Sequence, residues 1–214
     1  MIVALDGPAG SGKSTIAKML SKKYNLFNLN SGEFYRAFAY YHTKEKNRSI
    51  TNESEIASSL KEVSLSLQNG QVCISGHPIE KSALHTSEID NASSVLSANI
   101  DVRKKVNEVL RKVSENLDVI CEGRDITSVV FPNADVKIYL DADLLERAKR
   151  RSSEQNGALS ETAKLLQERD LRDMTKPFGA LKKVKDAKII DTTLLTISEV
   201  CDKISMEIEG CLQK

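Results

Sequence analysis

The sequence predicts an α/β fold in which helices cover both faces of a doubly wound, parallel, five-stranded β-sheet. Three observations support this prediction. Short apolar runs alternate with segments of helical periodicity, a glycine-rich loop joins the first run to the first helical segment, and no internal repeat or low-complexity tract interrupts this order. At 214 residues, the chain is long enough for one such domain with insertions.

The first strands and helices occupy the start of the chain. Residues 2–5 form an apolar run rich in β-branched side chains, which is typical of a buried parallel strand. Residues 14–24 place apolar side chains at helical spacing on one face and lysines on the other. Residues 25–30 then predict a second strand, and a second helix is expected from Ser31 onward.

The middle of the chain has a different pattern. Apolar and polar residues alternate over residues 63–67 and 71–75, on either side of Asn69-Gly70, a strong hairpin signal. An antiparallel hairpin inside a chain of alternating strands and helices predicts an inserted subdomain. Helical spacing resumes over residues 90–115.

Further apolar runs predict the remaining strands, at residues 119–122, 136–140 and 187–190. Sheets of this type bind ligands at the carboxyl ends of their strands. The charged residues expected at those ends are Asp6, Arg124, Asp125 and Asp141. We therefore expect the functional site at this edge of the sheet.

Composition excludes several classes of function. The formal net charge of +1 argues against a nucleic-acid binder, which needs a broad basic surface. No apolar stretch approaches the roughly 20 residues that span a bilayer, so no membrane partner is expected. The four scattered cysteines, without a C-x-x-C pair, indicate reduced thiols. A cytoplasmic protein is the resulting expectation.

The glycine-rich loop matches the phosphate-binding pattern G-x-x-x-x-G-K-[ST] over residues 7–14. In such a loop, glycines let backbone N–H groups turn toward an anion, and the start of the next helix adds its positive dipole end. Lys13 is expected to bridge the β- and γ-phosphates of ATP, and the Ser14 hydroxyl to bind Mg²⁺. The expected ATP-binding residues are Gly7, Pro8, Ala9, Gly10, Ser11, Gly12, Lys13, Ser14 and Thr15.

Other motifs occur in a fixed order around this loop: GPAGSGKST, NLNSGEFYR, EGRDITSVVFP, VKIYLDAD, QERDLRD and IIDTTLLTISEV. Together they resemble the bacterial cytidylate kinases that carry an enlarged nucleotide-binding insert. The resemblance implies an ATP-binding core over residues 1–30, 104–149 and 166–214, an insert that binds the nucleoside monophosphate over 31–103, and a lid over 150–165. It also implies transfer of the γ-phosphoryl group of ATP to CMP or dCMP with Mg²⁺.

The chemistry of this reaction favours arginine. The second pKa of a phosphate monoester is about 6, so the acceptor is mostly a dianion near neutral pH and needs no general base. Catalysis must align two anions that repel each other, and the guanidinium fork suits that task. The resemblance assigns Arg36 and Arg124 to the CMP phosphate, with Lys13 and Arg169 as the other catalytic residues. Arg169 and Asp173, on one face of a late helix, are candidates for the phosphate and the ribose.

The resemblance assigns base selection to Asp125, and a carboxylate suits this role because it accepts a hydrogen bond from the exocyclic amine of cytosine. Ser94 and Arg103 are expected beside it, and Ser31 and Tyr35 complete the implied CMP-binding set. Uracil presents a carbonyl in place of that amine, and the mismatch costs about 1–3 kcal/mol or more.

Some positions depart from the family pattern or stay open. Lys176 stands where the family has an arginine and cannot form a bidentate pair, so its phosphate contact is in doubt. Thr127 and Ser128 in the GRD segment are also departures, and little effect is expected from them. The expected lid arginines, Arg147, Arg150 and Arg151, fit closure over the phosphates and a solvated helix end equally well.

Two alternatives to a CMP kinase remain. A kinase with a hydroxyl acceptor would need a positioned base and would leave the GRD and NSGxxYR segments unexplained. A nucleotide-dependent switch would hydrolyse ATP without any monophosphate, but the chain has no N-K-x-D motif. A monomer is expected for the CMP kinase.

Overall fold

The structure is a computed structural model that describes residues 1–155 and 157–213. The chain divides into two compact units. The core unit comprises Met1–Leu29 and Asn116–Lys214, and the insert unit comprises Asn30–Glu115. The insert unit therefore continues beyond residue 103, because helix α6 (Ile100–Ser114) packs against other elements of that unit.

The core unit is built on a parallel β-sheet, in which the described residues give five strands in the order β2-β6-β1-β7-β8. The strands are β1 (Ile2–Asp6), β2 (Phe27–Asn30), β6 (Val119–Gly123), β7 (Val136–Asp141) and β8 (Lys188–Asp191). In the sheet register, Asp6 at the end of β1 lies between Gly123 of β6 and Tyr139 of β7. The carboxyl ends of three strands therefore meet beside Asp6, and the expected parallel sheet with flanking helices is confirmed.

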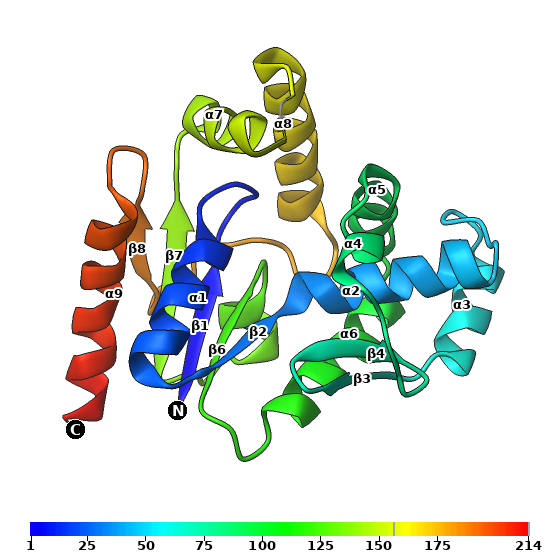
Figure 1. Cartoon of the computed structure of the whole chain (residues 1–214), viewed down its shortest axis with the longest axis horizontal. Coiled ribbons are helices and arrows are strands. Elements are labelled where there is room, and N and C mark those ends of the chain that lie inside the picture. The colour runs from blue at the N-terminus through cyan, green and yellow to red at the C-terminus, as the bar shows by residue number, and fades with distance from the viewer. Residues whose placement is uncertain (156, 214) are drawn as a thin grey trace. The chain divides into compact units, whose positions relative to one another are not determined.

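Two helices cover one face of this sheet. Helix α1 (Lys13–Tyr24) and helix α9 (Ile197–Leu212) lie side by side against the strands (Figure 1). Side chains such as Ile16, Leu20 and Ile204 pack with Val3 and Leu5 into one apolar cluster. Such burial of branched apolar side chains is the main force that holds the sheet and the helices together.

The remaining helices of the core unit are the short π-helical turn η2 (Ile126–Val130), α7 (Leu144–Gln155) and α8 (Leu159–Thr175). Helices α7 and α8 pack against each other. The turn η2 follows β6 directly after Arg124 and Asp125 and contacts β1. These elements place the charged motifs of the sequence at the carboxyl edge of the sheet.

The insert unit combines helices with a small antiparallel sheet. Its elements are α2 (Ser31–Tyr40), the π-helical turn η1 (Tyr41–Glu45), α3 (Glu53–Glu62), β3 (Leu65–Gln68), β4 (Gln71–Ile74), β5 (His77–Pro78), α4 (Lys81–Leu84), α5 (Ser87–Leu96) and α6. Asn69 and Gly70 have φ angles of 51° and 76°, which suit the tight turn predicted between β3 and β4. The strand β5 was not predicted from the sequence, because two residues carry no periodic signal.

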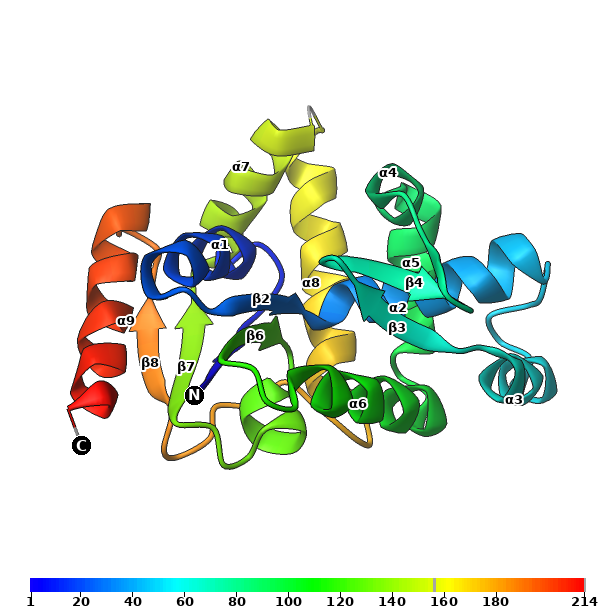
Figure 2. The same ribbon diagram turned by 60° about the horizontal axis from the view of Figure 1, so that its bottom comes forward.

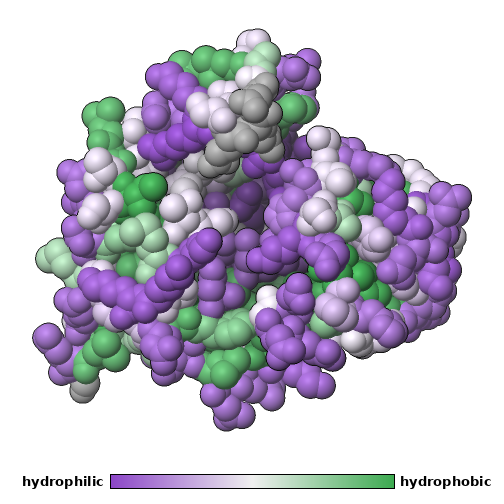
Figure 3. Space-filling view, viewed as in Figure 1, coloured by the Kyte–Doolittle hydropathy of each residue, from purple (hydrophilic) through white to green (hydrophobic). Residues whose placement is uncertain are grey.

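The helices of the insert unit begin where the sequence supplies capping side chains. Asn30 accepts a hydrogen bond from the Gly32 amide at 2.8 Å, and Asn52, Thr86 and Asn99 cap α3, α5 and α6 in the same way. Figure 2 shows α6 beside β3 in this unit. In Figure 3, polar side chains cover most of the visible face of the insert unit. Many of its apolar side chains, including Phe34 and Phe38, are buried.

Two features of composition, the apolar stretches and the cysteines, also have structural counterparts. Among them, no helix has the length and apolar character needed to cross a membrane. The cysteines at positions 73, 121, 201 and 211 are free thiols in the structure.

Candidate active site

The phosphate loop follows β1 and depends on glycine. A Cβ atom at Gly7 would lie 2.2 Å from the carbonyl oxygen of Leu140, so no other residue fits this close approach of the loop to β7. Gly10 and Gly12 have φ angles of 78° and 89°, and Gly12 is the N-cap of α1. The loop therefore turns directly into the N-terminus of a helix, an arrangement that favours bound anions.

Lys13 lies inside this loop. Its side chain is buried, and Nζ donates a hydrogen bond to the Pro8 carbonyl at 2.7 Å. Burial and the nearby Arg124 guanidinium hold the pKa of the Lys13 ammonium well below its usual range. The negative charge of a bound polyphosphate would stabilise the charged form of this buried ammonium. The position suits a lysine that contacts phosphates.

Ser14 and Glu122 form a hydrogen-bonded pair of oxygen-bearing side chains beside the loop. The Ser14 hydroxyl donates to Oε2 of Glu122 at 2.8 Å, and the Glu122 side chain is buried at the end of β6. Magnesium prefers oxygen ligands and is usually bound through one or two carboxylates together with substrate phosphates. The residues present therefore fit Mg²⁺ that arrives with ATP. Sequence analysis predicted Ser14 but missed Glu122, which carries no signal apart from its position before the GRD segment.

Arg124 belongs to a buried cluster with Asp173 and Lys176. Nε of Arg124 donates to Oδ2 of Asp173 at 2.8 Å, and Nζ of Lys176 donates to Oδ1 at 2.7 Å. Burial alone would raise the pKa of Asp173, but the charges of Arg124, Lys176 and Arg169 hold it well below its usual range. One carboxylate thus holds two cations in fixed positions, and Arg169 lies close enough to act on the same group.

This geometry refines the predicted roles in the late helix. Asp173 was expected at the ribose or the phosphate, whereas both of its oxygens bind cationic side chains of the core unit. Lys176, whose contact was in doubt, is almost fully buried and belongs to the same cluster. Asp173 therefore orients the cations that were predicted to bind the acceptor phosphate.

Asp125 occupies the N-cap position of η2 and is buried. The amides of Ile126 and Thr127 donate to the Asp6 carboxylate, each at 2.8 Å, and the Thr127 hydroxyl donates to it at 2.6 Å. Little effect was expected from Thr127, but its buried hydroxyl makes a contact that the sequence did not reveal. The signal that could have found it is a buried strand ending in Asp6, which needs donors nearby.

In the insert unit, Arg36 is paired with Asp90. Nε and Nη2 of Arg36 donate to Oδ1 of Asp90 at 3.0 and 2.5 Å, which joins α2 to α5. A Cβ atom at Gly32 would lie 3.0 Å from Nη1 of Arg36, so this nitrogen lies beside the first turn of α2. An arginine nitrogen beside a helix N-terminus is a favourable place for a phosphate. Sequence analysis predicted Arg36 and missed Asp90.

The other predicted residues of the insert unit are buried. Arg103 is 1% exposed, its Nη1 donates to the Ser97 carbonyl at 3.0 Å, and its guanidinium lies 5.2 Å from the centre of the Tyr35 ring. Ser31 and Ser94 are also buried, and no described residue forms a hydrogen bond with Oγ of Ser94. A buried hydroxyl without a protein partner is uncommon and suits a ligand contact.

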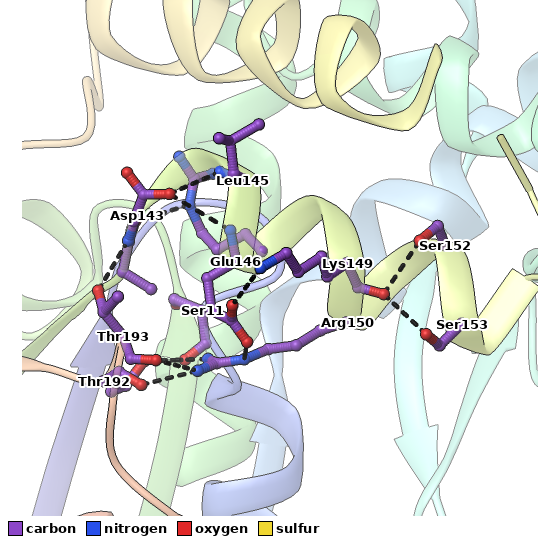
Figure 4. Close-up of polar contacts among 12 residues, drawn as sticks. Ser11, Asp143, Leu145, Glu146, Lys149, Arg150, Ser152, Ser153, Thr192 and Thr193 are labelled. Atoms are coloured by element: carbon purple, nitrogen blue, oxygen red, sulfur yellow. Dashed lines mark hydrogen bonds and ion pairs between the residues drawn. The ribbon is translucent and has the colours of Figure 1, made fainter. Parts of the chain in front are cut away.

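The three expected lid arginines have different surroundings. Arg147 is buried and donates to the carbonyls of Ala142 and Ala9 at 2.9 and 3.0 Å and to Asp170 at 2.6 Å. It thereby anchors the phosphate loop, an arrangement that neither sequence interpretation included. Arg150 donates to the carbonyls of Thr192 and Thr193 at 2.7 and 3.3 Å (Figure 4). Arg151 is half-buried on α7.

The chain is similar to a known family over nearly its whole length. A model of the family described as "Cytidylate kinase" matches residues 3–210. The chain is 41% identical to a cytidylate kinase of Fusobacterium nucleatum subsp. nucleatum, with 98% of this chain and 97% of that protein covered. It is 38% identical to a cytidylate kinase of Thermosipho melanesiensis, with 94% of each chain covered.

Solved structures resemble the fold. An uncharacterized protein from Eubacterium ventriosum matches with a TM-score of 0.53 and 14% identity, over 98% of each chain. A protein from Thermus thermophilus matches with a TM-score of 0.50 and 17% identity, over 98% of this chain and 97% of that one. At these identities the likeness shows the fold alone.

Proposed function

This chain belongs to the cytidylate kinase family, and from that premise we propose that it transfers the γ-phosphoryl group of ATP to CMP or dCMP. The observation that carries the proposal is the cluster of Arg124, Asp173 and Lys176 in the same unit as the phosphate loop. Strand β6, which leads to Arg124, pairs with β1, which leads to the loop. Two cationic regions on adjacent strand ends suit a reaction between two phosphates.

The donor end of the reaction uses the phosphate loop. The N-terminus of α1 and the Lys13 ammonium bind the polyphosphate, and Arg147 keeps the loop in place through the Ala9 carbonyl. Mg²⁺ would be held by Ser14, with Glu122 beside it, and would neutralise charge on the phosphate oxygens. Burial around Lys13 strengthens its attraction for the phosphates, because the surrounding dielectric is low.

The acceptor end uses arginine and lysine without a general base. The acceptor phosphate is already a nucleophile near neutral pH, so the protein has only to align it and to offset its charge. Arg124 and Lys176 are held by Asp173 before the substrate arrives, which limits the reorganisation needed during the reaction. Arg169 and, in the insert unit, Arg36 are the other candidates for this phosphate.

Selection of the base is proposed for Asp125, together with Ser94 and Arg103. Asp125 and Arg103 are each buried, where a mismatched hydrogen-bonding group is costly because water cannot replace the lost partner. A carboxylate faces the amine of cytosine favourably and the carbonyl of uracil unfavourably. CMP and dCMP are therefore the expected acceptors, and UMP a poor one.

The experiment that tests this function is a coupled assay of ADP release with a panel of nucleoside monophosphates. We expect rapid release with CMP and dCMP, much slower release with UMP, AMP and GMP, and almost none without an acceptor. Equal turnover of UMP would contradict the role of Asp125. Release that does not depend on any monophosphate would favour the nucleotide-dependent switch instead.

Other expectations belong to the same proposal. The insert unit contributes acceptor contacts, and residues 150–165 act as the lid, of which residue 156 lies outside the described residues. Arg150 and Arg151 remain candidates for contact with the transferring group, for which Arg150 would leave Thr192 and Thr193. A cytoplasmic monomer with Mg²⁺ as cofactor completes the proposal, and size-exclusion chromatography with light scattering tests the oligomeric state.

A further inference from the structure

Asp6 has no role in the reaction as described so far, yet it is completely buried in the core unit. It is the last residue of β1 and directly precedes Gly7 of the phosphate loop. Burial raises the pKa of its carboxyl group, although the hydrogen bonds from Thr127 and Ile126 oppose this effect. A buried carboxylate of this kind is costly to fold, so its contacts indicate what it stabilises.

All the hydrogen bonds described for the Asp6 side chain come from the two residues that follow Asp125. Oδ1 accepts from the Ile126 amide, and Oδ2 accepts from both the amide and the hydroxyl of Thr127. Ile126 and Thr127 are the first residues of η2. Asp6, at the end of β1, therefore caps the N-terminus of η2.

This arrangement leaves a task for Asp125 other than capping. Asp125 is the N-cap residue of η2, and aspartate at such a position usually turns its carboxylate back to accept from the amides of its own helix. Among the described residues, the Asp125 side chain makes no such capping bond, and Asp6 binds the first two amides instead. The two carboxylates also repel each other, since Asp125 contributes to the shift of Asp6.

We propose that Asp6 and Thr127 form a positioning pair for base selection: by capping η2 in place of Asp125, they hold the Asp125 carboxylate toward the base. The inference rests on the proposed role of Asp125 in binding cytosine. Neither Asp6 nor Thr127 needs to touch the nucleotide. Their effect is on the direction of the Asp125 side chain, and hence on the discrimination between CMP and UMP.

The test compares hydroxyl deletions at adjacent positions of the full chain. Thr127→Val removes the hydroxyl that binds Asp6, and Thr127→Ser retains it. Ser128→Ala is a matched control, because the buried Oγ atom of the half-buried Ser128 forms no hydrogen bond with any described residue. The ratio of kcat/KM for CMP to kcat/KM for UMP is measured for each variant, with the KM for ATP and the Tm.

We expect Thr127→Val to lower the CMP-to-UMP ratio by about tenfold, the size of one hydrogen bond to a charged group, mainly through a higher KM for CMP. The KM for ATP stays unchanged, and Thr127→Ser and Ser128→Ala keep the wild-type ratio. A merely structural role would lower the Tm and leave the ratio intact. That result would overturn the inference. If Thr127→Val does not fold, Thr127→Ala answers the same question.

Asp125→Asn separates failure of this inference from failure of the proposed site. If Asp125→Asn loses the preference for CMP while Thr127→Val keeps it, the pair does not position Asp125, although the proposed base selection stands. If Asp125→Asn also keeps the preference, the role of Asp125 is wrong and the inference falls with it. Asp6→Asn, which presents an amide donor to backbone donors, should lower the ratio at least as much as Thr127→Val.

Discussion

The core unit and the insert unit hold their arginines in different ways. In the core unit, Asp173 is shared by Arg124 and Lys176, so two cations face one carboxylate. In the insert unit, Arg36 is paired with a single carboxylate, Asp90. Counted over these groups alone, the first arrangement has one more positive than negative charge, and the second has one of each.

This difference suggests a division of tasks between the units. An excess of buried positive charge stabilises a phosphate dianion and the charge that develops during transfer. A neutral pair contributes less charge, but Asp90 fixes the guanidinium so that Nη1 lies beside Gly32. We therefore expect changes in the core cluster to lower kcat and changes at Asp90 to raise KM for the acceptor.

The largest effect is expected from Arg124→Met. This change removes the guanidinium that we propose binds the acceptor phosphate, and it leaves Asp173 with Lys176 as its described ion-pair partner. Loss of one preorganised donor typically lowers kcat by about 100- to 1000-fold. Steady-state kinetics with CMP measure the change. Arg124→Lys keeps the charge but not the guanidinium fork, so its kcat should lie between those of wild type and Arg124→Met. A loss below about tenfold would contradict the role of Arg124 in transfer.

Asp90→Ala tests the other half of the comparison. Arg36 would keep its charge and lose its orienting partner, so the KM for CMP should rise by about tenfold with little change in kcat. Asp90→Asn keeps one acceptor oxygen, so its KM for CMP should rise less than that of Asp90→Ala. If kcat falls as steeply as in Arg124→Met, the two units do not divide the work as described.

Lys176→Ala should have a smaller effect than Arg124→Met, because a lysine acts as a point charge without the fork of an arginine. We expect turnover to fall by about tenfold while the preference for CMP over UMP stays intact. Lys176→Arg restores the family residue and serves as the control. Wild-type rates in the alanine variant would mean that the buried Lys176 ammonium only pairs with Asp173 and does not contribute to turnover.

The smallest effect concerns acid stability. The pKa of Asp173 is held below its ordinary value in the folded chain. Its charged form therefore stabilises the fold above the unfolded pKa of about 4, and this contribution is lost as the pH falls through the folded value. Urea unfolding from pH 6 downward should show the advantage of wild type over Asp173→Asn shrinking below about pH 4. Asp101→Asn, which alters an exposed carboxylate, should give a curve parallel to wild type. A constant advantage at all pH values would contradict the ion-pair account.

Much of the fold was predictable because its signals are local. Each strand of the parallel sheet was expected within a few residues of its observed bounds, since buried strands are short apolar runs. The Asn69-Gly70 turn and the phosphate loop contain Asn and Gly residues with positive φ angles, and these residue types indicate such turns in the sequence. The added length of the insert unit was not predictable, because the packing of α6 depends on long-range contacts.

The site was predictable only in part. Lys13, Arg36, Arg124 and Asp125 lie in recognisable motifs, so their types and positions could be inferred from the sequence. Their partners could not, since Glu122, Asp90 and Thr127 act through contacts between elements. Arg147 shows the same limit, because a helix surface and a buried anchor have the same spacing in sequence. Sequence thus identifies the charged groups, and tertiary structure decides which of them are held in place and by what.

The central claim is that two phosphates are brought together by fixed cations, so that the γ-phosphoryl group passes to cytidylate. Its most direct measurement follows the label from ATP labelled at the γ-phosphate, with CMP and Mg²⁺ present. We predict that the label appears in CDP, with one ADP formed for each labelled CDP. Label that appears in inorganic phosphate, at a rate independent of CMP, would contradict the account.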